Sequence, residues 1–349
     1  MALPTEVPPG SLHGSAAPGV ADCHNDLLLA CRHRRERGVA DPFGDDWLPG
    51  LRAGGVVFQV LPIFTEEQFI GEGALRRTLE ILELAREIAE LHRHDVGIVE
   101  TADDIDEIVG DGRIALLLAL EGAEPVGSSL AMLETMWRLG VRLASLTWNR
   151  RTMLADGVGE TDTGGRLTSL GVEAVAEMER LGMVVDVSHL SAHGLAHLAE
   201  VAAEPFVASH SSCRALCDHP RNLSDAELRL VAGSGGFVAI NATGRFVAAS
   251  GTPTLDRYVD HVEHAVATVG DGAVAIGADF IADLLEQVDP ILGRQLLLRP
   301  EDIVHVEGLK GPADLALLSR RLQDRFGPER AARIAAGNVL GFLRARLPA

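Results

Sequence analysis

The chain has 349 residues, of which 47% are hydrophobic and 23% are charged, proportions typical of a globular protein. This composition excludes a wholly disordered or collagen-like chain. Asp and Glu outnumber Lys and Arg by 50 to 31, and the resulting net charge of −19 argues against nucleic acid as a partner, because phosphate backbones repel acidic surfaces.

Neither end of the chain carries a recognisable targeting signal. Residues 1–18 are rich in Pro, Gly and Ser, and we expect them to be loosely ordered. They lack the basic and apolar regions of a signal peptide, no apolar run reaches the length of a membrane span, and the C-terminus lacks a lipid-anchor signal. We therefore predict a cytoplasmic protein with no membrane partner. The four cysteines are too few for a disulfide framework and are predicted to be buried or harmless thiols.

Short apolar runs alternate with stretches of helical periodicity along the chain. Strands are predicted at residues 20–26, 54–60, 113–120, 141–148, 183–189, 205–210, 236–241 and 273–279. Helices are predicted at residues 74–94, 128–139, 169–181, 224–233, 255–269, 313–325 and 328–346. Ser224 begins a capping-box pattern, and Gly140 and Gly182 stand where helices should end.

Eight strands with helices between them predict an α/β fold of parallel strands, namely a (β/α)8 TIM-type barrel. The apolar run at 116–120 is typical of a strand that is covered on both faces. A doubly wound open sheet is the alternative, but no G-x-G-x-x-G motif follows the first strand. Residues 281–310 are predicted to form a long loop after the eighth strand. Because no linker divides the chain, residues 19–349 are predicted to form a single domain.

Polar side chains stand at the ends of the predicted strands. In chain order they are His24-Asn25-Asp26, Gln59, Glu121, Trp148-Asn149, His189, His210, Asn241 and Asp279. Barrel enzymes carry their chemistry at the carboxyl ends of the strands. We therefore expect these side chains to surround one axis at the mouth of the barrel.

Three imidazoles and two carboxylates in this set predict a metal centre. Such ligands suit Zn²⁺, with Mn²⁺ or Fe²⁺ as alternatives. Five ligands are too many for one tetrahedral site with an open position, and they fit two ions about 3.5–4 Å apart. We predict that His24 and Asp26 hold one zinc ion, that His189 and His210 hold the other, and that Glu121 bridges them.

Asp279 remains as the acid–base group of this centre. A hydroxide between two such ions is a nucleophile at neutral pH, because metal binding lowers the pKa of water from about 15.7 towards ~7. Asp279 would take the proton from this nucleophile and pass it to the leaving group. The other histidines are predicted to lie mostly on helices or loops, and Arg150 and Arg151 are predicted to be surface charges.

Eight stretches of the chain, in order, resemble the membrane (renal-type) dipeptidases, the binuclear-zinc peptidases of family M19. They are DCHNDL at 22–27, LRAGGVVFQ at 51–59, LALEGAE at 118–124, LTWN at 146–149, VVDVSHLS at 184–191, FVASHSSCRALCDHPRNLSD at 206–225, AIGADF at 275–280 and AGNVLGFLR at 336–344. The resemblance spans residues 20–346 and implies a (β/α)8 barrel that hydrolyses dipeptides (L-Xaa–L/D-Xaa), with the ligands and proton shuttle named above. It also implies a homodimer, and it implies that Arg221 binds the substrate carboxylate, which a guanidinium fork suits.

Two positions depart from the family pattern. Trp148 stands where the family usually has a histidine that positions the substrate, and an indole can donate only one neutral hydrogen bond. The family often has D-F-D-G after the eighth strand, where this chain has Asp279-Phe280-Ile281-Ala282. We therefore expect a shifted substrate preference. Two alternatives stay open: a binuclear-metal amidase or lactam hydrolase acting on a non-standard amide, and a catalytically weakened metal-binding barrel.

Overall fold

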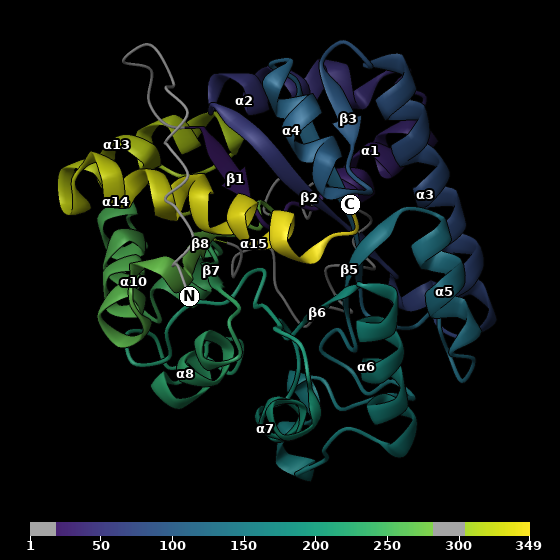
Figure 1. Cartoon of the computed structure of the whole chain (residues 1–349). Coiled ribbons are helices and arrows are strands. Elements are labelled where there is room, and N and C mark those ends of the chain that lie inside the picture. The colour runs from purple at the N-terminus through teal and green to yellow at the C-terminus, as the bar shows by residue number, and fades with distance from the viewer. Residues whose placement is uncertain (1–18, 282–303) are drawn as a thin grey trace, which may run out of the picture.

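Parallel strands alternate with helices through residues 19–281 and 304–349, the parts of the chain that the computed structural model describes (Figure 1). The strands are β1 (Val20–Asp22), β2 (Val56–Phe64), β3 (Val96–Ile98), β4 (Ile114–Glu121), β5 (Val141–Ser145), β6 (Val184–Asp186), β7 (Val238–Ile240) and β8 (Val274–Ile276). The longer helices are α1 (Leu27–Glu36), α3 (Glu72–Leu91), α4 (Ala102–Gly110), α5 (Ala131–Arg138), α6 (Ser169–Leu181), α7 (Ala192–Val201), α8 (Asp225–Gly233), α10 (Leu255–Val269), α13 (Leu315–Phe326) and α15 (Asn338–Arg346). Shorter helices include α2 (Leu48–Ala53), α9 (Gly244–Val247) and α14 (Pro328–Ala332). The predicted loose segment 1–18, and residues 282–303 of the predicted long loop, lie outside the described residues.

The strands form one parallel sheet that curls into a ring. Its order is β6-β5-β4-β2-β1-β8-β7, and β3 pairs with β4 beside this path. Residues 206–209, which we call the closing segment, join the two ends: Val207 bridges in parallel to Asp186 of β6, and Ala208 to Val238 of β7. The ring therefore has the eight members of the predicted (β/α)8 barrel.

One predicted strand is not a regular strand in the structure, and one observed strand was not predicted. The sixth predicted strand, 205–210, makes only isolated bridges, because each of its neighbours pairs with it at a single residue. β3 was not predicted, since three residues are too short for a period-2 pattern, and they pair only with the start of β4. The predicted bounds of α6 and α10 are confirmed, and so are the capping box at Ser224 and the left-handed Gly182 after α6.

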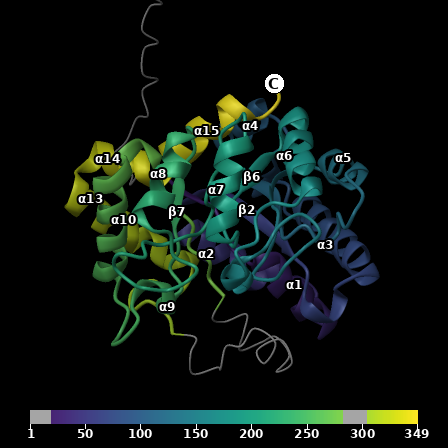
Figure 2. The same ribbon diagram turned by 90° about the horizontal axis from the view of Figure 1, so that it is seen from below.

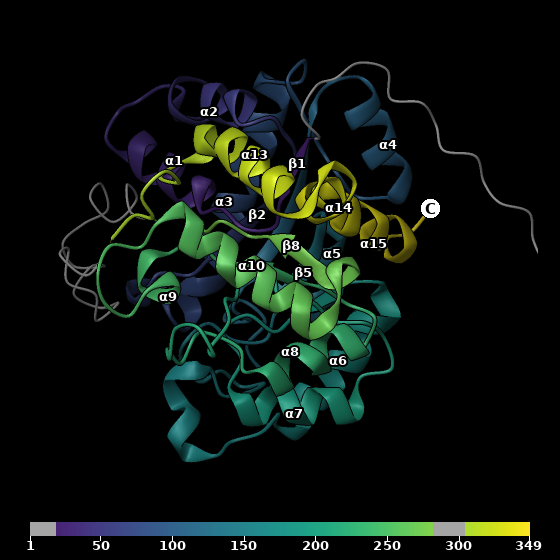
Figure 3. The same cartoon turned by 90° about the vertical axis from the view of Figure 1, so that its left-hand side faces the viewer.

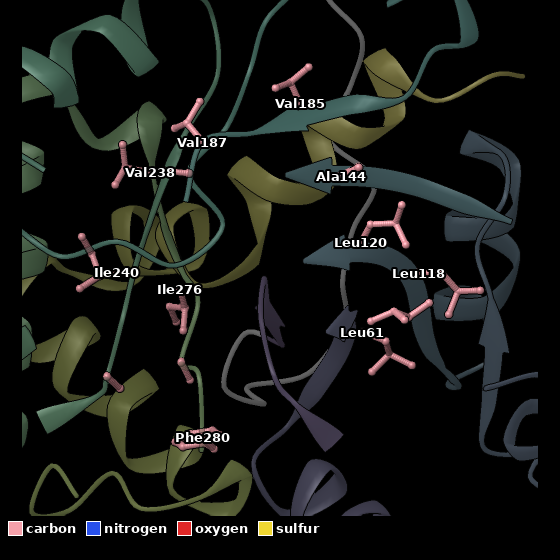
Figure 4. Packing of buried hydrophobic residues seen from close by; sticks show 14 of the residues in the cluster. Leu61, Leu118, Leu120, Ala144, Val185, Val187, Val238, Ile240, Ile276 and Phe280 are labelled. Carbon is pink, nitrogen blue, oxygen red and sulfur yellow. The ribbon is translucent and has the colours of Figure 1, made fainter. Parts of the chain in front are cut away.

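Alternate residues of the strands belong to two apolar layers. The layer between strands and helices contains the side chains that Figure 4 labels, which are Leu61, Leu118, Leu120, Ala144, Val185, Val187, Val238, Ile240, Ile276 and Phe280. The inner layer contains Phe58, Leu117 and Leu143 of the strands together with Val339 and Leu343 of α15. The barrel interior is therefore packed at the end that α15 covers, and the functional end is the opposite one.

Helices surround the ring on its outer side (Figures 2 and 3), where α10 lies against α13. Asn338 at the start of α15 donates from Nδ2 to the carbonyl oxygens of Asp271 and Val274, so α15 is fixed at the amino end of β8. All four cysteines are buried and free, as predicted. None of the described helices is both long and apolar enough to cross a membrane.

A buried histidine on α10 makes the stability of the fold depend on pH. His261 accepts a hydrogen bond at Nδ1 from the Cys213 N–H (3.0 Å), its Nε2 lies 3.0 Å from the Val247 carbonyl oxygen, and burial lowers its pKa to about 4. Below about pH 6.5 the unfolded chain binds a proton here that the folded chain does not bind, so stability falls as the pH falls.

Lowering the pH from 7.5 to 5 should reduce the unfolding free energy of both the unmodified protein and the His261→Gln variant. We expect this reduction to be about 2 kcal/mol smaller in His261→Gln than in the unmodified protein. Urea unfolding at the two pH values, in chelator so that metal binding does not contribute, measures both losses. Equal losses in the two proteins would show that His261 is not the origin of this dependence.

Candidate metal centre

Three of the predicted ligands meet around the carboxylate of a fourth at the carboxyl ends of the strands. Glu121 ends β4, and its Oε1 lies 2.9 Å from Nε2 of His189, 3.6 Å from Nε2 of His210 and 3.7 Å from Nε2 of His24. All four side chains are buried, and Nε2 of His189 lies 2.8 Å from Nε2 of His210. Three imidazole nitrogens therefore surround one oxygen of the Glu121 carboxylate, an arrangement whose donor atoms would suit a bound cation.

Asp26 and Asp279 extend this cluster on the side of His24. The ligand atoms of His24, Asp26 and Asp279 all lie within 4.8 Å of one another, and so do those of His24, Glu121 and His210. His24 belongs to both groups. The structure thus brings together all six residues, while the division of the ligands between two ions stays a prediction.

Unpartnered atoms and charge show that these residues suit divalent cations. Within the described residues, Nε2 of His24 and Oδ1 of Asp26 are buried without a hydrogen-bond partner. Burial lowers the pKa of His24 to about 4 and lowers those of His189 and His210 well below the usual value, so the imidazoles are neutral ligands at pH 7. Burial, and then the charge of neighbouring carboxylates, raises the pKa values of Asp26 and Glu121. Cations would relieve this repulsion and satisfy the free atoms.

A second set of residues orients the imidazoles. Asn149 Oδ1 lies 2.8 Å from Nδ1 of His189, and Ser209 Oγ lies 2.8 Å from Nδ1 of His210. The Ser209 hydroxyl donates to Asp186 Oδ2 at 2.5 Å, so it accepts from His210. Each arrangement places the proton on Nδ1 and directs the Nε2 lone pair towards Glu121.

Sequence reasoning missed these supporting carboxylates. Asp186 and Asp22 are the last residues of β6 and β1, within the predicted apolar runs, and both are buried. Asp22 accepts hydrogen bonds from Gln59 Nε2 and from the Ala278 N–H, and burial raises its pKa to about 7. An aspartate two or three residues before a ligand histidine was the signal that could have identified them.

Replacing Ser209 with alanine is expected to weaken metal binding by about 10- to 100-fold, because His210 loses the partner that fixes its tautomer. Competition with a chromogenic chelator measures the affinity. Ser212→Ala is the matched control, because that buried hydroxyl donates to the Asn241 carbonyl oxygen instead. Unchanged affinity in Ser209→Ala would contradict the assigned role.

Backbone conformation is unusual at two site residues. His189 (φ +74°) and Asp279 (φ +55°) are the only non-glycine residues with positive φ in the described parts of the chain. Such conformations persist where surrounding contacts enforce them. Asp279 is held by its N–H, which donates to the His24 carbonyl oxygen, and by Asn241 Nδ2 and Thr243 Oγ1, which both donate to Oδ2. The other oxygen, Oδ1, lies 4.0 Å from His24 Nε2.

Arg221 is a buried cation beside the cluster, with 7% of its surface exposed. Its Nη2 donates to the His210 carbonyl oxygen at 3.3 Å, and its guanidinium lies 5.7 Å from the ring centroid of Phe246. No carboxylate in the described part of the chain forms an ion pair with it. Burial lowers its pKa, the nearby Asp279 and Glu121 oppose this, and the group remains able to bind an anion.

Trp148 is half-buried, with its ring centroid 5.7 Å from that of the His189 imidazole and 5.0 Å from that of Phe64. The prediction that Arg150 is a surface charge is wrong. Arg150 is partly buried, because the carboxylates of Glu124 and Glu67 and a backbone carbonyl oxygen bind its guanidinium, with Nε donating to Glu124 Oε1 at 2.8 Å. The guanidinium also lies over the Trp148 ring. Arg151 is exposed and pairs with Asp156, as a surface charge would.

Comparison with known proteins now decides the family. The model of the membrane dipeptidase family, peptidase family M19, matches residues 16–297. The chain belongs to this family.

An uncharacterized dipeptidase of Schizosaccharomyces pombe is 35% identical over 285 residues, which cover 75% of this chain and 68% of that protein. Dipeptidase verJ of Clonostachys rogersoniana is 32% identical over 234 residues, and Dipeptidase 3 of Mus musculus is 29% identical over 309 residues. These matches cover 65% and 83% of this chain but only 60% and 62% of the two relatives.

Two solved peptidase structures, one of them of family M19, share the fold. A dipeptidase of family M19 superposes with a TM-score of 0.82 at 25% identity, covering 96% of this chain and 100% of that chain. A metallopeptidase from Rhodobacter sphaeroides, liganded with a phosphinate mimic of the dipeptide L-Ala-D-Ala, gives a TM-score of 0.82 at 24% identity, covering 95% and 100%. The predicted TIM-type barrel and the predicted M19 membership are therefore confirmed.

Proposed function

We propose that this M19 family member is a dipeptidase that holds two divalent cations and hydrolyses the peptide bond of short dipeptides. Zinc is the cation we expect at both positions. The observation that carries this proposal is the contact of three imidazoles with Glu121, beside the unpartnered Oδ1 of Asp26. His24 and Asp26 would hold one cation, His189 and His210 the other, and Glu121 both. Bound there, the cations would polarise the scissile carbonyl and lower the pKa of a bound water.

The remaining residues of the site would handle the substrate and the proton. Asp279 Oδ1 would accept a proton from the attacking water and deliver it to the nitrogen of the leaving amine. Asn241 and Thr243 support this role, since they hold the other oxygen, Oδ2, and leave Oδ1 facing the cluster. The product amine would then leave carrying that proton, and the carboxylate of Asp279 would be restored.

Arg221 would bind the carboxylate at the C-terminal end of the substrate. A buried guanidinium without an ion-pair partner in the described part of the chain is suited to a small anion that enters from solution. Because Arg221 is tied to the backbone of His210, it would place the scissile bond at a fixed distance from the metal ligands. Longer peptides would have no free carboxylate at that distance.

A substrate panel tests the proposal directly. Protein loaded with Zn²⁺ is mixed with L,L and L,D dipeptides, with the corresponding dipeptide amides and with tripeptides, and the release of amino acids is followed. Rapid hydrolysis of the dipeptides alone is expected. Equal turnover of the amides would exclude the role of Arg221 and favour a binuclear amidase or lactam hydrolase. No turnover of any substrate by the metal-loaded protein would favour a catalytically weakened barrel.

A further inference from the structure

Three loops at the mouth of the barrel meet at one arginine. Arg150, after β5, donates from Nη2 to the Thr65 carbonyl oxygen in the loop after β2 (2.7 Å) and pairs with Glu67 in the same loop. Its Nε donates to Glu124, in the loop after β4. The guanidinium is therefore satisfied by protein groups, and it ties the three loops together.

This arginine packs on two aromatic rings. Its guanidinium carbon lies 5.2 Å from the ring centroid of Trp148 and 5.7 Å from that of Phe64. Phe64 is buried in an apolar cluster with Leu29 and Ala30, and Trp148 packs against the same cluster. We call Phe64 and Trp148 the aromatic wall. Because the rings contact each other and the Arg150 guanidinium packs against both, the rings are held in place.

The loop after β2 is also held by contacts with helices α1 and α3. Glu66 is fully buried, and its carboxylate binds the Arg77 guanidinium at two points, including Nε to Oε2 at 2.8 Å. His33 Nε2 lies 3.2 Å from Glu66 Oε1. These contacts anchor the loop to α1 and α3. The wall is thus pre-formed, which is what a binding surface requires in order to discriminate between side chains.

The position of the wall indicates which part of a dipeptide would reach it. The ring of Trp148 adjoins His189 on the side of β2, β4 and β5. Arg221 contacts the backbone of His210 and the ring of Phe246, on the side of β7. A chain of contacts links the two: Trp148 adjoins His189, His189 and His210 both approach Glu121, and the His210 carbonyl oxygen accepts from Arg221. A dipeptide whose carboxylate is on Arg221 and whose peptide bond is at the ligands would therefore extend its N-terminal residue towards the wall.

We propose that the aromatic wall receives the side chain of the N-terminal residue and gives the enzyme a preference for dipeptides in which this side chain is large and apolar. The inference rests on the proposed function, which sets the direction of the substrate. Phe64 is buried and supports the half-buried Trp148, and an apolar side chain would gain by leaving water against the exposed part of the Trp148 ring. An acidic side chain would gain little from Arg150, because its donors are already bound by Glu124, Glu67 and Thr65.

The test compares kcat/KM for L-Phe-D-Ala, L-Leu-D-Ala, L-Ala-D-Ala and L-Asp-D-Ala with zinc-loaded protein. We expect Phe to be favoured over Ala by about 10- to 100-fold, and Asp to be the poorest of the four. In Trp148→Ala the preference for Phe over Ala should fall about tenfold, while Trp148→Phe should keep most of it. As a readout without any variant, L-phenylalanine should inhibit the unmodified enzyme at about tenfold lower concentration than L-alanine.

Trp137→Ala is the matched control. Trp137 also lies under an arginine, with the Arg142 guanidinium 4.6 Å from its ring, but it is on α5, which precedes β5, whereas Trp148 follows that strand. The substrate preference of the Trp137→Ala enzyme should equal that of the unmodified protein. An active enzyme without preference for large apolar side chains, or a preference unchanged in Trp148→Ala, would overturn the inference and leave the dipeptidase function standing. Failure to hydrolyse any dipeptide would overturn both.

Discussion

Replacing Asp279 with asparagine is expected to lower kcat on a good dipeptide by about 10²- to 10⁴-fold, while two metal ions per chain are retained. Asparagine has the same shape, and its amide oxygen can still accept the hydrogen bonds from Asn241 and Thr243. It cannot accept and return a proton at neutral pH. Steady-state kinetics and elemental analysis of the same preparation measure the two effects separately.

The control for this variant is Asp271→Asn. Asp271 precedes β8 whereas Asp279 follows it, and Asp271 pairs with Arg330 and Arg333 at the amino end of the strand. Its kcat should be unchanged. Because the Asp279 carboxylate lies near His24 and Asp26, the Asp279→Asn variant also tests whether Asp279 is a metal ligand. Loss of metal together with activity in Asp279→Asn would mean that its main role is to hold a cation.

Glu121→Gln is expected to abolish the binding of at least one cation and to reduce activity to background. An amide lacks the charge with which a carboxylate can bind two cations. In unmodified protein, metal at about 1,000 times its dissociation constant should add about 4 kcal/mol to the unfolding free energy, and this gain should largely disappear in the variant. Thermal unfolding with and without Zn²⁺ measures it.

In the metal-free protein, Glu121→Gln should not lower the unfolding free energy. Glu121 is buried near Asp26 and Asp279, and burial together with their charges raises its pKa. Removing one carboxylate from this group should leave the metal-free protein at least as stable as the unmodified protein. Glu124→Gln, three residues further on, should keep both cations, since Glu124 pairs with Arg150. Full metal binding by Glu121→Gln would contradict the bridging role.

The sequence was informative where the parallel barrel imposes a rule. Since the carboxyl ends of parallel strands meet at one end of the barrel, polar residues that follow apolar runs can be placed together from the sequence alone. His24, Glu121, His189, His210 and Asp279 do meet there. α6 and α10 were predicted with their observed bounds because their ends carry clear stop signals or a long apolar period.

Contacts between distant loops could not be read from local patterns. Arg150 looked like a surface charge because nothing near it in sequence reveals that Glu67 and Glu124 lie beside it. Asp186 does belong to β6, as predicted, but the local pattern did not show that it also accepts the Ser209 hydroxyl hydrogen bond that orients His210. β3 and the closing segment were misjudged because their short pairings depend on neighbours that tertiary structure supplies.

The paired-cation centre is tested most directly by counting the metal. Purified protein is stripped with a chelator, reloaded with Zn²⁺, freed of excess metal by gel filtration and analysed for zinc per chain by elemental analysis, beside Glu121→Gln treated in the same way. If two cations share Glu121, as proposed, the unmodified protein will hold two zinc ions per chain and the variant fewer. Fewer than one ion per chain in the unmodified protein, or equal content in both, would contradict the account of this site.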